Sequence, residues 1–255
     1  CVTGRSADGV EGFVGIPFAA PPVGDLRWAP PQPPTPWSTP LEAVDRAPAC
    51  VQTYGSGDGS FGAGEGDEDC LYLNVLRPAG TQPGDDLPVL FFVHGGSHID
   101  GWAGSGTYLG GSFGRLSTDP PLFPEAANLP TDDVILVTHQ YRLGALGWFG
   151  HEGLEGEFPS GGLGNQGLLD TQLALQWAHD NVRAFGGDPD RIVAFGHSAG
   201  ATSVCTLLTV DGTEDLISGA VLQSSGCLHV REAVDAPLGL QGHNQGARLA
   251  ELVGC

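Results

Sequence analysis

The sequence G-H-S-A-G at residues 196–200 places a serine between two glycines. It follows a short apolar run at residues 192–195 and precedes residues 201–208, which can form a helix. A G-x-S-x-G pattern between a strand and a helix predicts a nucleophile elbow, in which the serine sits on a sharp turn. The turn is too tight for side chains on either side, which explains the glycines. We therefore expect Ser198 to be a catalytic nucleophile at the carboxyl edge of a parallel sheet, beside a helix N-terminus.

A second segment offers the groups that acyl transfer needs. Residues 89–93 form a continuous apolar run, typical of a strand buried on both faces, and H-G-G-S follows at residues 94–97. Consecutive glycines let backbone N–H groups approach a ligand, and such donors stabilise the negative charge that develops on a carbonyl oxygen in the transition state. We expect the N–H groups of Gly96, Ser97 and Ala199 to form this oxyanion hole.

Further motifs occur in a fixed order along nearly the whole chain. They read FVGIPFAAPPVG at 13–24, LRW at 26–28, EDCLYLNV at 68–75, YRLGA at 141–145, GNQGLLD at 164–170 and FGGDP at 185–189. With the serine and glycine motifs, they make the chain resemble the type-B carboxylesterases, a group that includes cholinesterases, bacterial carboxylesterases and some fungal lipases. The resemblance implies an α/β-hydrolase fold with a doubly wound, mostly parallel sheet, and hydrolysis of carboxylic esters through an acyl-enzyme.

The pattern of apolar runs independently favours an α/β sheet, because strand candidates alternate with helix candidates. We expect strands at residues 71–76, 89–93, 134–138, 192–195 and 220–223, and an antiparallel edge within residues 1–37. The clearest helix spans residues 168–182. Its expected core-facing stripe contains Leu169, Leu173 and Trp177, broadened by Leu168, Leu175 and Val182.

The remaining members of a catalytic triad are expected outside this chain. In this fold the order is serine, then acid, then histidine, and the resemblance places the last two beyond residue 255. His229 and His243 match no position of the family. We therefore interpret residues 1–255 as the amino-terminal portion of a single α/β-hydrolase domain, with a sheet that is incomplete at its carboxyl-terminal side.

The chain departs from the family at two places beside the expected site. His197 stands where the family usually has glutamate, which we interpret as a packing substitution. The family's HGGGF becomes H-G-G-S-H, with Ser97 and His98 in the last two places. Although His94 and His98 are four residues apart, the glycines between them argue against a helix, and no glutamate lies between them. We therefore expect no zinc site.

The resemblance also implies a disulfide and an ion pair in the amino-terminal part of the chain. Cys50 and Cys70 match a family disulfide that closes a loop, and Arg27 and Glu68 match a family ion pair. A disulfide would indicate an oxidising compartment, so we expect a secreted or periplasmic protein, with a cytoplasmic location as the alternative.

The other four cysteines are interpreted separately. We expect Cys205 to be a buried apolar residue within a helix. Cys255 resembles a family cysteine whose partner lies further on, although Cys227 could pair with it instead. Cys1 has no assigned role.

Composition limits the choice of ligand. The net charge of −20, with 10 arginines and no lysine, excludes nucleic acid and anionic membranes as natural partners. No run of 18 apolar residues could span a membrane. The loop at residues 50–70 offers only Tyr54 and Phe61 as aromatic groups, whereas cholinesterases have a tryptophan there that stacks on quaternary ammonium. We expect a small uncharged ester as substrate, and neither a cofactor nor a metal.

The sequence also allows functions other than ester hydrolysis. The same fold includes non-catalytic cholinesterase-like interaction modules, and a truncated domain could also be inactive. Interaction modules of this kind typically lose the nucleophile, so the presence of Ser198 favours an enzyme. Lipase and carboxylesterase activities differ in segments that these residues do not reveal.

Overall fold

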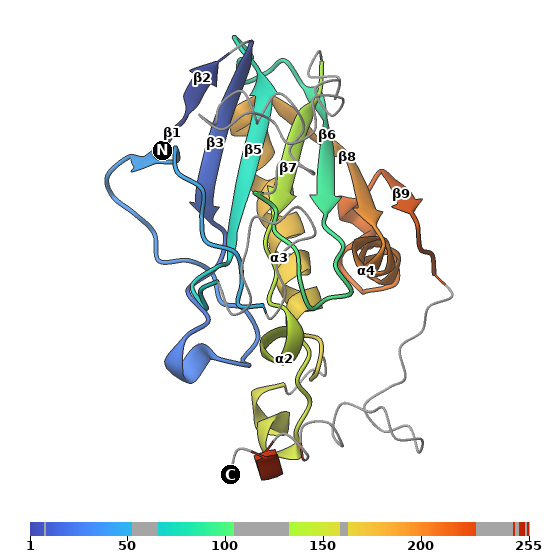
Figure 1. The fold of residues 1–255 in the computed structure, drawn as a ribbon. Coiled ribbons are helices and arrows are strands. Elements are labelled where there is room, and N and C mark those ends of the chain that lie inside the picture. Colours follow the sequence, from blue (N-terminus) through green and yellow to red (C-terminus); the bar gives the residue numbers. More distant parts are fainter. Residues whose placement is uncertain are drawn as a thin grey trace.

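The computed structural model describes residues 1–7, 9–52, 66–104, 133–158, 163–227, 247, 250–252 and 254. Within them lies one large sheet of seven strands, in the order β2-β3-β5-β7-β6-β8-β9 (Figure 1). The strands are β2 (Arg5–Ala7), β3 (Val10–Pro17), β5 (Tyr72–Pro78), β6 (Leu87–Val93), β7 (Ile135–His139), β8 (Gly187–His197) and β9 (Gly219–Gln223). A small parallel sheet joins β1 (Val2–Thr3) to β4 (Leu41–Glu42).

The direction of the strands confirms the expected architecture. Strands β7, β6, β8 and β9 are parallel to one another. Strands β2, β3 and β5 continue the sheet by antiparallel pairing, which confirms the antiparallel edge near the amino terminus. Each strand expected from an apolar run is present. For β6 and β7 the reason is burial on both faces, which needs apolar side chains at consecutive positions.

The two longer helices pack against the central strands (Figure 1). They are α3 (Gln166–Asn181) and α4 (Ala199–Leu207), and α2 (Gly144–Gly147) is a single turn before α3. Short 3-10 helices lie at η1 (Gly24–Leu26), η3 (Glu152–Glu157), η4 (Val182–Phe185) and η5 (Glu214–Leu216). The main hydrophobic core lies between these helices and the strands, and Phe91, Ile135, Leu175 and Val204 are among its members. A smaller apolar cluster includes Val10, Leu76, Phe92 and Leu136. No helix among the described residues is both long and apolar enough to cross a membrane.

The expected apolar stripe of α3 is confirmed only in part. Leu175 and Val182 are buried in the core, whereas Leu169, Leu173 and Trp177 are only partly buried. The fully buried face of the helix lies beside them. That face consists of Gln166, Gly167, Asp170, Thr171, Ala174, Leu175 and Ala178. Its small residues let the helix approach closely, as a Cβ at Gly167 would lie 2.6 Å from the carbonyl oxygen of Arg142. Most of the large apolar side chains therefore lie at the margin of the contact.

Two disulfides join segments that are distant in sequence. Cys50 pairs with Cys70, as the resemblance implied. Cys205 is buried within α4, as expected, but it pairs with Cys227, with 5.4 Å between their Cα atoms. The alternative pairing of Cys227 with Cys255 is therefore wrong. The reason is that α4 packs on β9 and brings its cysteine to the segment after that strand. Cys1 is an exposed free thiol, and Cys255 lies outside the described residues.

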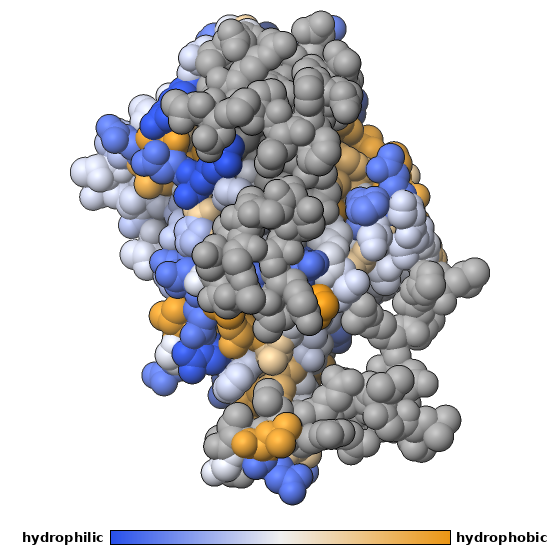
Figure 2. Space-filling model, viewed as in Figure 1, coloured by the Kyte–Doolittle hydropathy of each residue, from blue (hydrophilic) through white to orange (hydrophobic). Residues whose placement is uncertain are grey.

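Strand β9 forms one edge of the sheet within the described part of the chain. The side chain of Val221 on this strand is 46% exposed. Figure 2 shows hydrophobic surface on the side of the molecule where β8 and β9 lie. An edge of this kind has unpaired backbone groups beside apolar side chains, which favours pairing with a further strand.

Removing the Cys205–Cys227 disulfide is expected to destabilise the fold. Closing a loop of 22 residues restricts the unfolded chain by about 3 kcal/mol. We expect the double variant Cys205→Ser/Cys227→Ser to lose roughly that free energy of unfolding in urea titrations of the full-length protein. Cys1→Ser should change it by less than about 0.5 kcal/mol, because this thiol is exposed and unpaired. Equal stability of the double variant and the parent would contradict a structural role for the disulfide.

Candidate active site

Ser198 occupies a sharp turn between strand β8 and helix α4. The strand ends at His197 and the helix begins at Ala199. Ser198 has φ 53° and ψ −120°, a backbone conformation that non-glycine residues rarely adopt. Such residues cost about 1–3 kcal/mol and persist only where the surroundings fix them. The geometry is that of the elbow predicted from the sequence, with the serine at the positive end of a helix.

The two glycines of the elbow are required by close backbone contacts. A Cβ at Gly200 would lie 2.6 Å from the carbonyl oxygen of His94, at the end of β6. A Cβ at Gly196 would lie 2.5 Å from the backbone nitrogen of Ala201. Because backbone atoms cannot yield as a flexible side chain can, larger residues at either position would separate the strand from the helix.

The elbow is also tied to the neighbouring strand β9. The backbone N–H of Ser198 donates to the carbonyl oxygen of Gln223 at 2.8 Å. The hydroxyls of Thr202 and Ser225 are hydrogen-bonded at 2.9 Å, and the Cys205–Cys227 disulfide follows one turn further along the helix. These links hold the first turns of α4 to the segment after β9.

The glycine segment after β6 runs beside the elbow. A Cβ at Gly95 would lie 2.7 Å from the carbonyl oxygen of His197 and 3.2 Å from the Cβ of Ser198. Gly96 and Ser97 both have positive φ, at 108° and 55°. Serine therefore occupies the left-handed region at the place where the family has a third glycine. The structure thus brings the expected oxyanion segment and the expected nucleophile together, in two loops that follow adjacent parallel strands.

His94 is a structural residue of this segment. Its ring stacks on Tyr141 with centroids 4.3 Å apart, and the Tyr141 hydroxyl donates to the His94 carbonyl oxygen at 2.8 Å. Its Nδ1 lies 2.8 Å from the carbonyl oxygen of Gly95. Burial lowers the pKa of His94 to about 4, so the ring is neutral at neutral pH.

The histidine that replaces glutamate packs beside the glycine loop. His197 is partly buried, and a Cβ at Gly95 would lie 3.0 Å from its Nδ1. This position agrees with a packing substitution. The Ser198 hydroxyl has no hydrogen-bond partner among the described residues, and His229 and His243 lie outside them. The described residues also contain no group of His, Cys, Asp and Glu side chains that could hold a metal ion.

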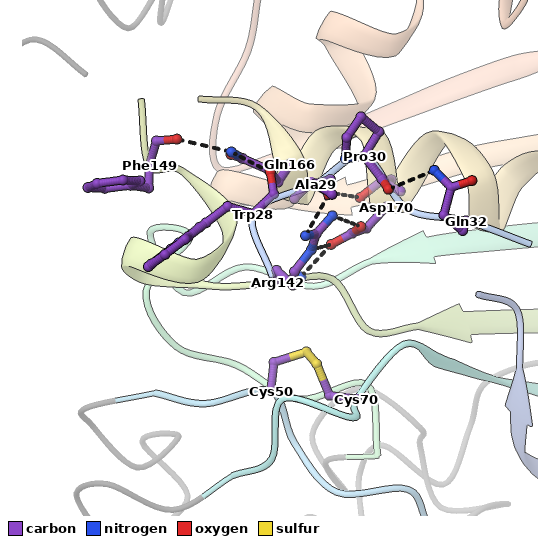
Figure 3. A network of polar contacts seen from close by, with 12 residues as sticks. Trp28, Ala29, Pro30, Gln32, Cys50, Cys70, Arg142, Phe149, Gln166 and Asp170 are labelled. Atoms are coloured by element: carbon purple, nitrogen blue, oxygen red, sulfur yellow. Dashed lines mark hydrogen bonds and ion pairs between the residues drawn. A yellow bond between two sulfur atoms is a disulfide. The ribbon is translucent and has the colours of Figure 1, made fainter. Parts of the chain in front are cut away.

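Arg142 and Asp170 form a buried ion pair. The sequence analysis did not predict this pair, although the two residues lie in the motifs YRLGA and GNQGLLD. Arg142 follows β7, and its Nη2 and Nε donate to the two carboxylate oxygens of Asp170 on α3, each at 2.8 Å. The Arg142 Nη1 donates to the carbonyl oxygen of Ala29 at 2.9 Å (Figure 3). The two side chains are 3% and 0% exposed. The pair joins the amino-terminal segment, the loop after β7 and helix α3.

A second, exposed ion pair matches the one that the resemblance implied. Arg27 donates to both carboxylate oxygens of Glu68, at 2.6 and 2.7 Å. This contact raises the pKa of Arg27, first through the hydrogen bond and then through the opposite charge. It holds the amino-terminal segment to the loop that the Cys50–Cys70 disulfide closes.

A cavity of about 370 Å³ lies between α4 and the start of α3. Its lining includes His98, Trp148, Asn165, Leu168, Thr206 and Cys205. Ser198 is not among the residues that line it, so the cavity adjoins the expected site without containing the expected nucleophile.

Comparison with known proteins places this chain in a family. The chain matches the carboxylesterase family over residues 2–255, and it therefore belongs to that family. Its fold is that of the α/β-hydrolases. A thermophilic PNB esterase of known structure superposes with a TM-score of 0.82 at 32% identity, over 99% of this chain and 47% of that chain. A carboxylesterase of Geobacillus stearothermophilus gives 0.79 at 34% identity, over 99% and 46%.

Relatives of known function carry esterase names. The fumonisin B1 esterase of Sphingopyxis macrogoltabida is 43% identical over 225 residues, which are 87% of this chain and 38% of that protein. The cocaine esterase of Homo sapiens is 37% identical over 235 residues, which are 89% of this chain and 38% of that protein. The chain thus spans less than half the length of these relatives.

The buried ion pair is expected to matter far more for stability than the exposed one. Asp170→Asn keeps the shape of the side chain but leaves the Arg142 charge buried and unpaired, and we expect a loss of about 3–5 kcal/mol. Glu68→Gln makes the same chemical change in a pair whose arginine is 41% exposed, and should cost at most about 1 kcal/mol. Urea unfolding of the two full-length variants compares them, and equal losses would contradict the assignment.

Gly95→Ala should impair catalysis by moving the glycine loop away from Ser198. The new Cβ would meet the His197 carbonyl oxygen at 2.7 Å, and a displacement of about 1 Å can cost roughly 100-fold in rate. Gly156→Ala is the matched control, because a Cβ there meets nothing within 4 Å. The measurement is p-nitrophenyl acetate hydrolysis by the full-length protein, and an unchanged rate for Gly95→Ala would show that the loop does not shape the site.

Proposed function

We propose that this protein is a serine hydrolase that cleaves carboxylic esters through an acyl-enzyme intermediate. The observation that carries the proposal is the strained turn at Ser198 beside the glycine segment after β6. Membership of the carboxylesterase family and the esterase names of the relatives support the same chemistry.

Ser198 is the nucleophile in the proposed reaction. Its Oγ forms a bond to the ester carbonyl carbon and gives its proton to a general base. The N–H groups of Gly96, Ser97 and Ala199 stabilise the negative charge on the carbonyl oxygen. The bond to the alcohol then breaks, and the alcohol takes the proton from the base. Water attacks the acyl-enzyme with the help of the same base, releasing the acid and restoring Ser198.

The base and its orienting carboxylate are proposed to come from residues other than those described here. The triad order of this fold places both after the serine, and the Ser198 hydroxyl has no partner among the described residues. The 255 residues then form the amino-terminal portion of a single α/β-hydrolase domain, in agreement with the 38% of each relative's length that they cover.

The substrate is proposed to be a small uncharged ester. The net charge of −20 disfavours anionic partners, and membership of the carboxylesterase family supports an ester as substrate. The two disulfides support folding in an oxidising compartment, outside the cytoplasm.

A fluorophosphonate probe tests the nucleophile directly. We expect one probe molecule to attach to Ser198 of the full-length protein, as located by peptide mass spectrometry. Ser198→Ala should abolish labelling and lower kcat for p-nitrophenyl acetate by roughly 10⁴-fold or more. The exposed Ser38→Ala should retain full activity. A full-length protein that neither reacts with the probe nor hydrolyses esters would instead indicate a non-catalytic interaction module.

A further inference from the structure

His98 lies at the end of the glycine segment and reaches across to helix α4. The residue is 3% exposed. Its Nε2 lies 3.1 Å from the carbonyl oxygen of Ala199 and 3.0 Å from the Oγ of Ser203. The Ser203 hydroxyl also donates to the Ala199 carbonyl oxygen, at 3.3 Å. Three polar groups therefore meet within one turn of α4.

The chemistry of these groups sets the tautomer of His98. A carbonyl oxygen only accepts hydrogen bonds, so Nε2 contacts Ala199 by donating. The hydroxyl of Ser203 accepts from the same N–H while donating its own proton to Ala199. This arrangement satisfies all three groups at once. A phenylalanine, which the family pattern has in this place, offers no donor.

The contact connects the two segments that carry the proposed oxyanion donors. His98 directly follows Ser97, and Ala199 directly follows Ser198. Both Ser97 and His98 have positive φ, at 55° and 63°, so this part of the loop is strained and needs outside support.

Two further contacts supply such support to His98. Its carbonyl oxygen accepts from the backbone N–H of Gly144 at 2.7 Å, and its ring packs on Trp148 with centroids 4.2 Å apart. The ring is thus held on one side by an aromatic face and on the other by helix α4.

We infer that His98 is a positioning residue, which fixes the Gly96–Ser97 segment relative to the Ala199 N–H through its bond to the Ala199 carbonyl. The inference rests on the proposed function, because it assumes that these N–H groups form the oxyanion hole. Donors that stabilise a transition state must be placed before the charge develops, since any reorganisation adds to the barrier. His98 and Ser203 perform this task without touching the substrate.

Kinetics of full-length His98→Phe test the inference. This variant keeps the aromatic packing on Trp148 but loses the donor. We expect kcat to fall roughly 10- to 100-fold with KM changed less than about twofold, because donor placement matters mainly in the transition state. The inhibition constant of a trifluoromethyl ketone, which forms a charged tetrahedral adduct with a nucleophilic serine, should rise by a similar factor. His98→Gln, which can place an amide N–H near the position of Nε2, should recover most of the lost activity.

Two variants on α4 complete the design. Ser203→Ala should lower kcat by a smaller factor, and its effect should be non-additive with His98→Phe, because both act on the same contact. Thr206→Val is the matched control, since the Thr206 hydroxyl also donates to a carbonyl one turn back on α4, at 3.0 Å, whereas the His98 Nε2 bonds to Ala199 and Ser203. It should keep kcat within twofold.

The outcomes separate this inference from the proposed function. If Ser198→Ala abolishes hydrolysis while His98→Phe retains the parent kcat and inhibitor affinity, the positioning role is wrong and the nucleophile stands. If His98→Phe and His98→Gln lose equal activity, or if KM and thermal stability change while inhibitor affinity does not, His98 acts only in packing. If Ser198→Ala keeps full activity, the proposed function itself fails.

Discussion

The close approach of three backbone segments at the carboxyl edge of the sheet is the constraint on which the candidate site depends. Strand β6 ends at Val93 opposite Gly196 of β8, and helix α4 starts against both. The parallel pairing fixes the ends of β6 and β8, and the chain then turns sharply from β8 into α4 at Ser198. Ser198 takes up the resulting strain at φ 53°. Glycine at residue 200 is therefore required by geometry, because any side chain there would push α4 away from the His94 carbonyl.

The buried ion pair between Arg142 and Asp170 also holds separate segments of the chain together. Burying an ion pair costs desolvation energy, which excellent geometry and further hydrogen bonds must offset. Asp170 meets this condition by accepting from both the side chain and the backbone N–H of Arg142, and the Ala29 carbonyl accepts a further guanidinium proton. Moving α3 along the sheet would break these hydrogen bonds and leave the Arg142 charge buried without its partner, which costs about 3–5 kcal/mol. The ion pair thus fixes the loop after β7, against whose end His98 is held through Gly144.

The sequence predicted the parts of the structure that depend on local patterns. The central strands were found because their apolar runs reflect burial on both faces, and the elbow was found because Ser198 lies between a strand and a helix. The face of α3 was predicted only in part: Leu175 is buried as expected, but small and polar residues such as Asp170 make up most of the buried face, and large apolar residues do not mark it. The Cys205–Cys227 pair depends on how α4 packs against β9, and sequence spacing carries no information about that contact.

Burial makes His94 and His139 poor candidates for a catalytic base. His94 and His139 are fully buried, and burial lowers their pKa values to about 4 and about 3. A base with so low a pKa accepts a proton poorly at neutral pH, and the best general bases titrate near the working pH. His139 stacks on Phe91 with centroids 4.7 Å apart, as an aromatic core residue would. His94 and His139 are therefore packing residues, and in the proposed reaction the general base is a different residue.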